Sequence, residues 1–247
     1  SFLKDHNDIL RHQQKDRLLS FPGGMEELAQ KLAIPLKKEI HLAHSVEKIA
    51  RRKDYWEVTH KNLEGTVTKE KFDEVTSTIP SHQILSIEWD SIEGMENIST
   101  LASATHYPLA LVYLGFQKKE IKHPLDGFGF LVPEVENLKI LGTLFSSTLF
   151  PGRAPDGQVL LTTFVGGERN PELTNLPDHA LGELVQNELS KLLGIHAPPI
   201  FVEVKKWPAA IPLPDAEMKK RKNAANKLSS SNPGLCFSGS FLTGVSL

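Results

Sequence analysis

The sequence lacks most of the features that define common classes of protein. Cys236 is its one cysteine, so an internal disulfide is impossible and no thiolate metal cluster is expected. The longest uninterrupted aliphatic or aromatic run covers residues 109–114 and is much shorter than the roughly 20 residues that span a bilayer. A formal net charge of −2 gives no general attraction for nucleic acid. The sequence therefore predicts neither a membrane-spanning helix nor a nucleic-acid-binding surface.

Motifs for phosphate binding and hydrolysis are also missing. Neither G-x-G-x-x-G nor G-x-x-x-x-G-K-[ST] occurs; Gly127 and Gly129 begin the first pattern, but Val132 replaces its third glycine. No G-x-S-x-G elbow is present, and Cys236 stands in an apolar run typical of a buried, unreactive thiol. His41 and His44 form an H-x-x-H without a third ligand nearby, so no metal site is predicted. These absences disfavour a hydrolase.

Basic residues gather in two short clusters, residues 51–53 and 219–222. Nearby acids and spacer residues dilute both clusters, which favours a solvated surface over contact with an anionic membrane.

What is present is a pattern of short strands and two helices. Met25, Leu28 and Leu32 follow Gly23 and Gly24 at helical spacing, which predicts a helix with a buried side. A second helix is predicted after Asp178, its proposed cap, and is expected to stop at Gly194.

Strand-like segments of β-branched and aromatic residues follow one another along much of the chain. Successive strands favour an antiparallel or mixed sheet, so the predicted fold class is α/β in the α+β sense. The strand-like segments are "IHLAHSVEKI", "YWEVTH", "FDEVTSTIP", "YPLALVYLGF", "GFGFLVP", "KILGTLFSSTLF", "QVLLTTFVGG" and "PGLCFSGSFLTGVSL", the last leading into a glycine-rich turn.

Several ordered motifs resemble the protoporphyrinogen oxidase family, whose members are FAD-dependent oxidases of haem and chlorophyll synthesis. The motifs are "SFPGGMEELAQKLA", "HPLDGFGFLVP", "LGTLFSSTLFPGRAPDG", "TTFVGG", "KKWPAAIPLP" and "PGLCFSGSFLTGVSL". The family begins with a dinucleotide-binding segment that this sequence does not contain. The resemblance therefore implies the carboxy-terminal half of such an enzyme, inactive when isolated.

The resemblance implies two parts. Residues 1–82 and 230–247 are expected to form part of an FAD-binding domain, and residues 83–229 a substrate-binding domain with a mixed or antiparallel sheet. The implied reaction oxidises protoporphyrinogen IX to protoporphyrin IX with FAD and oxygen. No catalytic residue or substrate cation is assigned.

A tetrapyrrole is a wide apolar ring, so its site needs aliphatic and aromatic walls and glycines where backbone comes close. The resemblance places Phe128, Gly129, Leu131, Leu144 and Phe164 against this substrate. From the residues alone, Leu144 and Phe164 are expected core residues.

Cofactor contacts follow from the same resemblance. Val46 matches a position whose backbone meets FAD, and Trp207 an aromatic beside the flavin, although Trp207 alone is an expected core residue. The closing segment corresponds to a turn and helix start whose N–H groups can stabilise charge on a reduced flavin. Its matching residues are Gly239, Val245, Ser246 and Leu247.

Two alternatives remain open. One is another amine-oxidase-like flavoenzyme, such as a carotenoid desaturase or an amine oxidase. The other is a non-enzymatic module that binds an apolar ligand. An intracellular location is expected, in the cytoplasm or at a membrane surface because the product is apolar, and the oligomeric state is left open.

Overall fold

A computed structural model of the protein describes residues 19–213 and 215–244 of the 247 in the chain. The chain divides into two units, residues 1–41 and 42–247, and each is described by itself. The predicted contacts of Val245, Ser246 and Leu247 lie outside the described residues. Among the described residues, no helix combines the length and the apolar character needed to cross a membrane.

The first unit contains helix α2 (Glu26–Ala33) and a 3-10 turn (Ile34–Leu36). The helix is where the sequence predicted it, but the prediction of a buried side is wrong. Met25, Leu28 and Leu32 are exposed by 49%, 38% and 63%, because the other described element of this unit, the 3-10 turn, has three residues and is too short to cover the helix.

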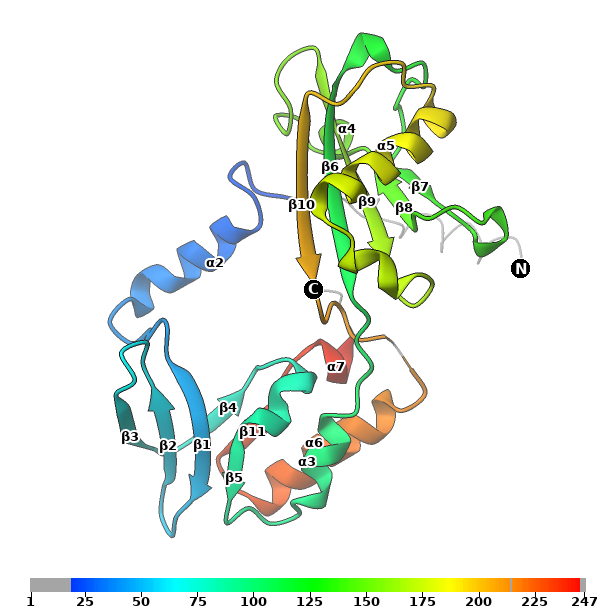
Figure 1. Ribbon diagram of the computed structural model, residues 1–247. Coiled ribbons are helices and arrows are strands. Elements are labelled where there is room, and N and C mark those ends of the chain that lie inside the picture. Colours follow the sequence, from blue (N-terminus) through cyan, green and yellow to red (C-terminus); the bar gives the residue numbers. More distant parts are fainter. Residues whose placement is uncertain (1–18, 214, 245–247) are drawn as a thin grey trace, which may run out of the picture. The chain divides into compact units, whose positions relative to one another are not determined.

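The second unit contains two larger sheets, with β4 and β11 forming a separate pair (Figure 1). The first sheet has the order β3-β2-β1-β5, with β1 antiparallel to β2 and parallel to β5. Strands β4 and β11 are parallel to each other. The strands are β1 (Ser45–Arg51), β2 (Trp56–Lys61), β3 (Val67–Phe72), β4 (Val75–Ser77), β5 (Glu88–Asp90) and β11 (Leu235–Phe237).

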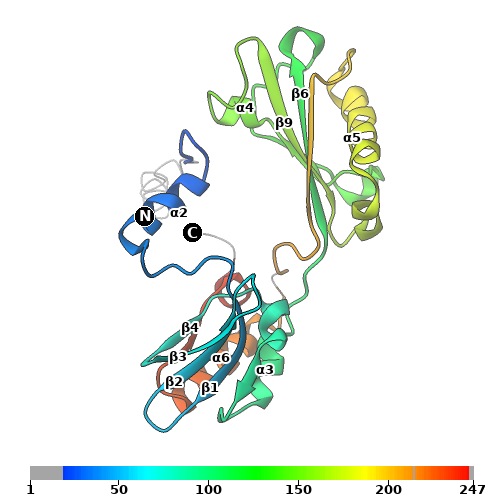
Figure 2. The same cartoon turned by 60° about the vertical axis from the view of Figure 1, so that its left-hand side comes forward.

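Helices α3 (Glu96–Leu101) and α6 (Met218–Ser231) lie side by side in this region (Figure 2). With a 3-10 turn (Ser81–Ser86) and α7 (Ser240–Thr243), they surround a core that includes the fully buried Trp56. Cys236 is exposed, so the expectation of a buried thiol is wrong. In β11 the side chains alternate, and Leu235 takes the buried position.

Helix α6 was not predicted, because its mean hydropathy is low and its apolar face is made mainly of Ala224, Ala225 and Leu228. Arg221 lies on this face and is fully buried, so the solvated role expected for its cluster is wrong at this position. Its guanidinium donates to both carboxylate oxygens of Asp215, at 2.6 and 3.1 Å, and to the carbonyl oxygen of Phe241 at 3.2 Å. These bonds supply the partners that a buried charge requires.

The second sheet has the order β10-β6-β9-β8-β7 and is antiparallel throughout. The predicted α+β class with mixed and antiparallel sheets is confirmed. Its strands are β6 (Leu109–Gln117), β7 (Gly129–Leu131), β8 (Gly142–Leu144), β9 (Gln158–Gly166) and β10 (Phe201–Trp207). Its helices are α4 (Ser146–Leu149) and α5 (Asp178–Leu193), with 3-10 turns at Lys118–Glu120, Glu134–Glu136 and Pro171–Asn175.

Helix α5 packs on one face of this sheet and ends at Gly194, which has the left-handed conformation (φ 63°) expected of a helix stop. Asp178 is the first helical residue and Pro177 holds the cap position, so the predicted capping role of Asp178 is wrong. Leu181, Val185 and Leu189 of the helix are fully buried against Ala110, Val112, Leu114, Leu161 and Val165 of the sheet.

The two hydrophobic cores use different segments of the chain. One core draws on residues 49–104 and 224–242, and the other on residues 110–195. Residues 84–104 and 224–228 therefore pack with β1 and β2, although the sequence placed them in the substrate-binding part. The functional division near residues 82 and 230 stays a prediction.

Replacing Arg221 with alanine should lower the free energy of unfolding by about 3 kcal/mol, because the change leaves a cavity and removes a buried guanidinium with three bonds. Urea unfolding at pH 7 measures the effect, and Lys220→Ala, an exposed neighbour paired with Glu217, is the control.

The Arg221 bonds hold the pKa of Asp215 below its usual value. The pair thus stabilises the fold at neutral pH, and the gap between the wild type and Arg221→Ala should narrow as pH falls through that pKa. An equal loss of unfolding free energy in Arg221→Ala and Lys220→Ala at pH 7 would contradict this account.

Candidate functional site

The antiparallel register determines which side chains share each face of the second sheet. Residues directly opposite one another point to the same face, and successive residues point to opposite faces. Leu111 pairs with Lys205 on one side and with Phe164 on the other, and Phe164 also pairs with Gly142. All of them alternate with core residues, so they lie on the face that α5 does not cover.

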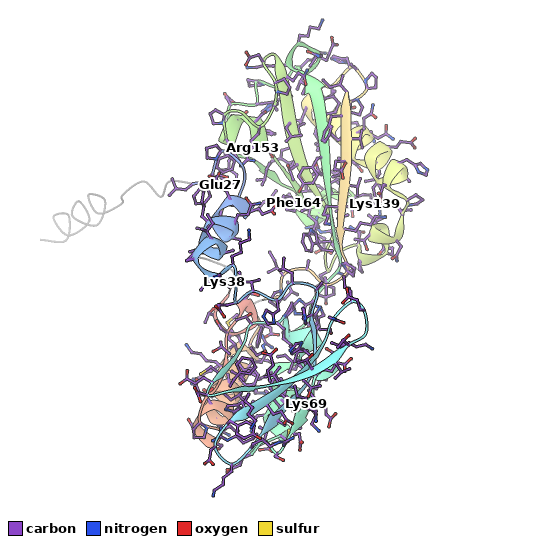
Figure 3. The ribbon with its side chains drawn as sticks, turned by 90° about the vertical axis from the view of Figure 1, so that its left-hand side faces the viewer. Glu27, Lys38, Lys69, Lys139, Arg153 and Phe164 are labelled. Carbon is purple, nitrogen blue, oxygen red and sulfur yellow. The ribbon has the colours of Figure 1, made fainter. Side chains whose placement is uncertain are left out.

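We call this surface the open face. Figure 3 shows Phe164 on the side of the sheet away from the yellow helix α5. Apart from glycines and Thr162, the residues of the open face are half-buried or exposed. Its other side chains are those of Phe201, Glu203, Lys205, Trp207, Leu109, Leu111, Tyr113, Gln117, Gln158, Leu160, Phe164, Leu144 and Leu131.

A cavity of about 490 Å³ begins at one end of the open face. Leu109, Leu111, Phe164 and Trp207 form its sheet side. The segment after β4, the residue His106 shortly before β6, the segment after β11 and the chain beyond β10 form the rest. Those residues are Thr78, Ile79, Pro80, His106, Ala209, Ala210, Ile211, Pro212, Gly239, Ser240 and Phe241.

His106 is the one ionisable side chain among the described residues that line the cavity. Its Nε2 is 2.8 Å from the hydroxyl oxygen of Ser81, and its Nδ1 is 2.5 Å from the carbonyl oxygen of Ala210. A carbonyl oxygen only accepts, so Nδ1 carries a proton, and in the neutral ring Nε2 accepts from the Ser81 hydroxyl. Burial, and secondarily the His106 charge, lower the pKa of the neighbouring His82.

The cavity lies where two parallel strands end. β4 leads into Thr78 and β11 leads into Gly239, and ligands in sheets with parallel strands bind beyond these carboxyl ends. Gly239 has no room for a side chain, because an added Cβ would lie 2.7 Å from the ring of Phe241. The glycine therefore allows the ring of Phe241 to lie close against the backbone of this turn.

The structure brings together three of the residues that the resemblance predicted for the site. Phe164, predicted for substrate, and Trp207 and Gly239, predicted for cofactor, line the same cavity. Leu144 and Leu131 share the open face with Phe164 and Trp207, but they are not among the described residues that line the cavity. Phe128, just before β7, is 55% exposed.

Val46 lies in β1, outside the described lining of the cavity. The pairing of β1 with β2 shifts between Val46 and Lys48, which marks a β-bulge. Bulges leave part of the strand backbone unpaired, as a backbone contact with a ligand requires.

Sequence patterns had not singled out several lining residues. Leu109 and Leu111 could have been found, because they alternate with the core residues Ala110 and Val112 in one strand. His106 carries no pattern of its own, and residues 209–212 stand in the motif "KKWPAAIPLP" without a predicted role; the place of both depends on the meeting of distant segments.

Gly129 has a structural role in addition to its predicted place in the site. Its φ is +138°, and an added Cβ would lie 2.1 Å from the carbonyl oxygen of Thr143 in β8. The glycine is therefore needed for pairing of β7 with β8, and a side chain there would meet the neighbouring strand before any ligand.

The family follows from comparison of the whole chain. A model of the flavin containing amine oxidoreductases matches residues 3–245. The chain belongs to this family.

Among its relatives, the mitochondrial protoporphyrinogen oxidase of Nicotiana tabacum is 33% identical over 239 residues, covering 92% of this chain and 47% of the relative. Protoporphyrinogen oxidase 2 of Arabidopsis thaliana, chloroplastic or mitochondrial, is 32% identical with the same coverage. The chain thus spans about half the length of these relatives.

The fold is shared with a solved structure from Exiguobacterium sp. 255-15 that carries a provisional assignment as protoporphyrinogen oxidase. The TM-score is 0.78 at 23% identity, covering 96% of this chain and 51% of that one.

Gly129→Ala should lower the free energy of unfolding by about 2 kcal/mol, because alanine is strained at this φ and its Cβ meets backbone. Gly127→Ala is the matched control two residues away, where an added Cβ meets nothing within 4 Å. It should change stability by less than about 0.5 kcal/mol. Urea unfolding compares the two variants, and equal stability would show that β7 tolerates a side chain at Gly129.

Proposed function

We propose that this chain supplies the tetrapyrrole-binding sheet and part of the flavin site of a protoporphyrinogen oxidase. The reaction would convert protoporphyrinogen IX to protoporphyrin IX, with FAD as cofactor and oxygen as the final acceptor. The observation that carries the proposal is an apolar cavity continuous with the open face, in a chain about one-third identical to enzymes of that name.

The cavity residues fit the ring system of a flavin. A flat apolar ring needs an aromatic or aliphatic wall on one side and a close backbone on the other. Trp207 and Leu109 supply the wall, and the turn at Gly239, which Arg221 anchors through the carbonyl oxygen of Phe241, supplies the backbone. When bound, a flavin accepts hydride from a substrate carbon.

The remaining task of the chain is to hold the substrate and exclude water. Leu111 and Phe164 lie on both the open face and the cavity wall, so a ring lying over them would reach from the sheet to the flavin position. Leu144 and Leu131 continue this apolar surface across β8 and β7. Orientation and exclusion of water are the contributions that such a surface can make to hydride transfer.

Two other functions fit the same surface less well. Amine oxidases and carotenoid desaturases also need an apolar flavin site, but the relatives with about one-third identity are protoporphyrinogen oxidases. A module that only binds an apolar ligand would use the open face without the flavin. Ligand preference separates these possibilities.

Titration of the chain with protoporphyrin IX should quench the fluorescence of Trp207, which is 48% exposed, whereas Trp56 and Trp89 are buried. Putrescine and cyclohexylamine should cause no quenching. The Trp207→Phe variant is the control, because it should lose the quenching at low ligand concentration. Binding of an amine in preference to the tetrapyrrole would favour an amine oxidase, and binding of neither would contradict the tetrapyrrole site.

Leu144→Ala and Phe164→Ala should each weaken protoporphyrin IX binding by roughly 1 to 2 kcal/mol, the value of one apolar side chain taken from water. Both side chains are half-buried, so melting temperatures should change little. Phe145→Ala is the control, because Phe145 follows Leu144 but points into the core with 3% exposure. It should lose about 3 kcal/mol of stability. If the melting temperatures of Leu144→Ala and Phe164→Ala are as low as that of Phe145→Ala, and both variants bind protoporphyrin IX normally, both residues belong to the core.

A further inference from the structure

We propose that Lys205 binds a carboxylate of the tetrapyrrole and makes the open face selective for acidic tetrapyrroles. The inference rests on the proposed function, because it assumes that the apolar ring lies over Leu111 and Phe164. Protoporphyrinogen IX carries propionate side chains, which an apolar surface alone cannot bind.

The register places Lys205 on the open face. Lys205 pairs with Leu111, and Leu111 pairs with Phe164 on the next strand. Neighbouring strands are about 4.8 Å apart, so Lys205 lies roughly 10 Å across the sheet from Phe164. A tetrapyrrole centred near Leu111 and Phe164 has its edge at such a distance.

The ammonium of Lys205 points along the open face toward the cavity. Its Nζ lies 5.5 Å from the centroid of the Trp207 ring, which is two residues along the strand and lines the cavity. Within the described ranges Lys205 has no acidic partner at ion-pair distance. Contact of an exposed cation with an aromatic face is weak, so a carboxylate can compete for the ammonium.

The cavity itself cannot take the carboxylate. Its described lining contains no lysine or arginine, and both ring nitrogens of His106 already contact Ser81 and Ala210. A ligand with an apolar ring in the cavity must therefore leave its acidic group at the rim, where Lys205 lies.

Glu203 determines toward which end of β10 the ligand carboxylate points. It precedes Lys205 by two residues, lies on the same face and pairs with Tyr113. Burial, and then the negative charge of the paired Glu203, raise the pKa of Tyr113. A ligand carboxylate is repelled at Glu203 and attracted at Lys205, on the side of Trp207.

The neighbouring lysine provides a matched control. Lys206 points to the opposite face, where its Nζ lies 3.0 Å from Asp178 and donates to the carbonyl oxygen of Leu176. Lys205→Gln and Lys206→Gln remove the same charge from adjacent positions on the two faces of β10.

The test compares binding of protoporphyrin IX and of its dimethyl ester to the 247-residue chain, followed by Trp fluorescence. Lys205→Gln should weaken binding of the diacid about three- to fivefold, as expected for an exposed ion pair, and leave binding of the ester unchanged. Lys206→Gln should bind both like the wild type. Salt at about 0.5 M should remove most of the difference between wild type and Lys205→Gln.

The outcomes separate the two proposals. If the wild type binds both ligands and Lys205→Gln binds the diacid normally, the role of Lys205 is overturned while the tetrapyrrole site stands. An equal loss in Lys205→Gln and Lys206→Gln would indicate a general charge effect and would also overturn it. If neither ligand binds the wild type, the proposed function fails and the inference fails with it.

Discussion

The site depends on one constraint, the alternation of side chains across a sheet that has a long helix on one face. Ala110, Val112 and Leu114 of β6 are fully buried on the face that helix α5 covers. The intervening Leu109 and Leu111 must then point away from the core, where they are only half-buried. An apolar surface of this kind on a folded protein marks a place for a ligand or partner. The apolar cavity adjoins this surface.

Other contacts determine where the cavity ends. His106 connects Ser81, after β4, with Ala210, after β10, and the backbone of Thr105 accepts from Leu213 in the same region. Arg221 bonds to the carbonyl oxygen of Phe241 beside the Gly239 turn. These polar contacts join segments that are distant in sequence, so the cavity walls do not depend on apolar packing alone.

Much of the fold could be predicted from local sequence. Segments rich in β-branched, aliphatic and aromatic residues predicted the long strands β6 and β9, and the period of α5 together with Gly194 predicted the extent of that helix. Patterns failed where tertiary contacts decide. The apolar face of α2 is exposed, Cys236 faces outward, and α6 was missed because a buried arginine looks like a surface residue in sequence.

The site was less accessible to sequence patterns. Phe164, Trp207 and Gly239 were predicted only through the resemblance, and no period in the sequence connects them. Their common cavity arises because β9, β10 and the turn after β11 end near one another. Lys205 could not be distinguished from Lys206 without the register of β10 against β6.

The central claim is that a tetrapyrrole lies on the open face beside Trp207. Fluorine NMR of the chain labelled with 5-fluorotryptophan tests it most directly, because the chain has three tryptophans in distinct places and the ring current of the macrocycle shifts nearby nuclei. Trp56 and Trp89 are buried in the other core. The account predicts that protoporphyrin IX moves the Trp207 resonance and leaves the other two in place. A stationary Trp207 resonance with a shifted Trp56 or Trp89 would contradict it.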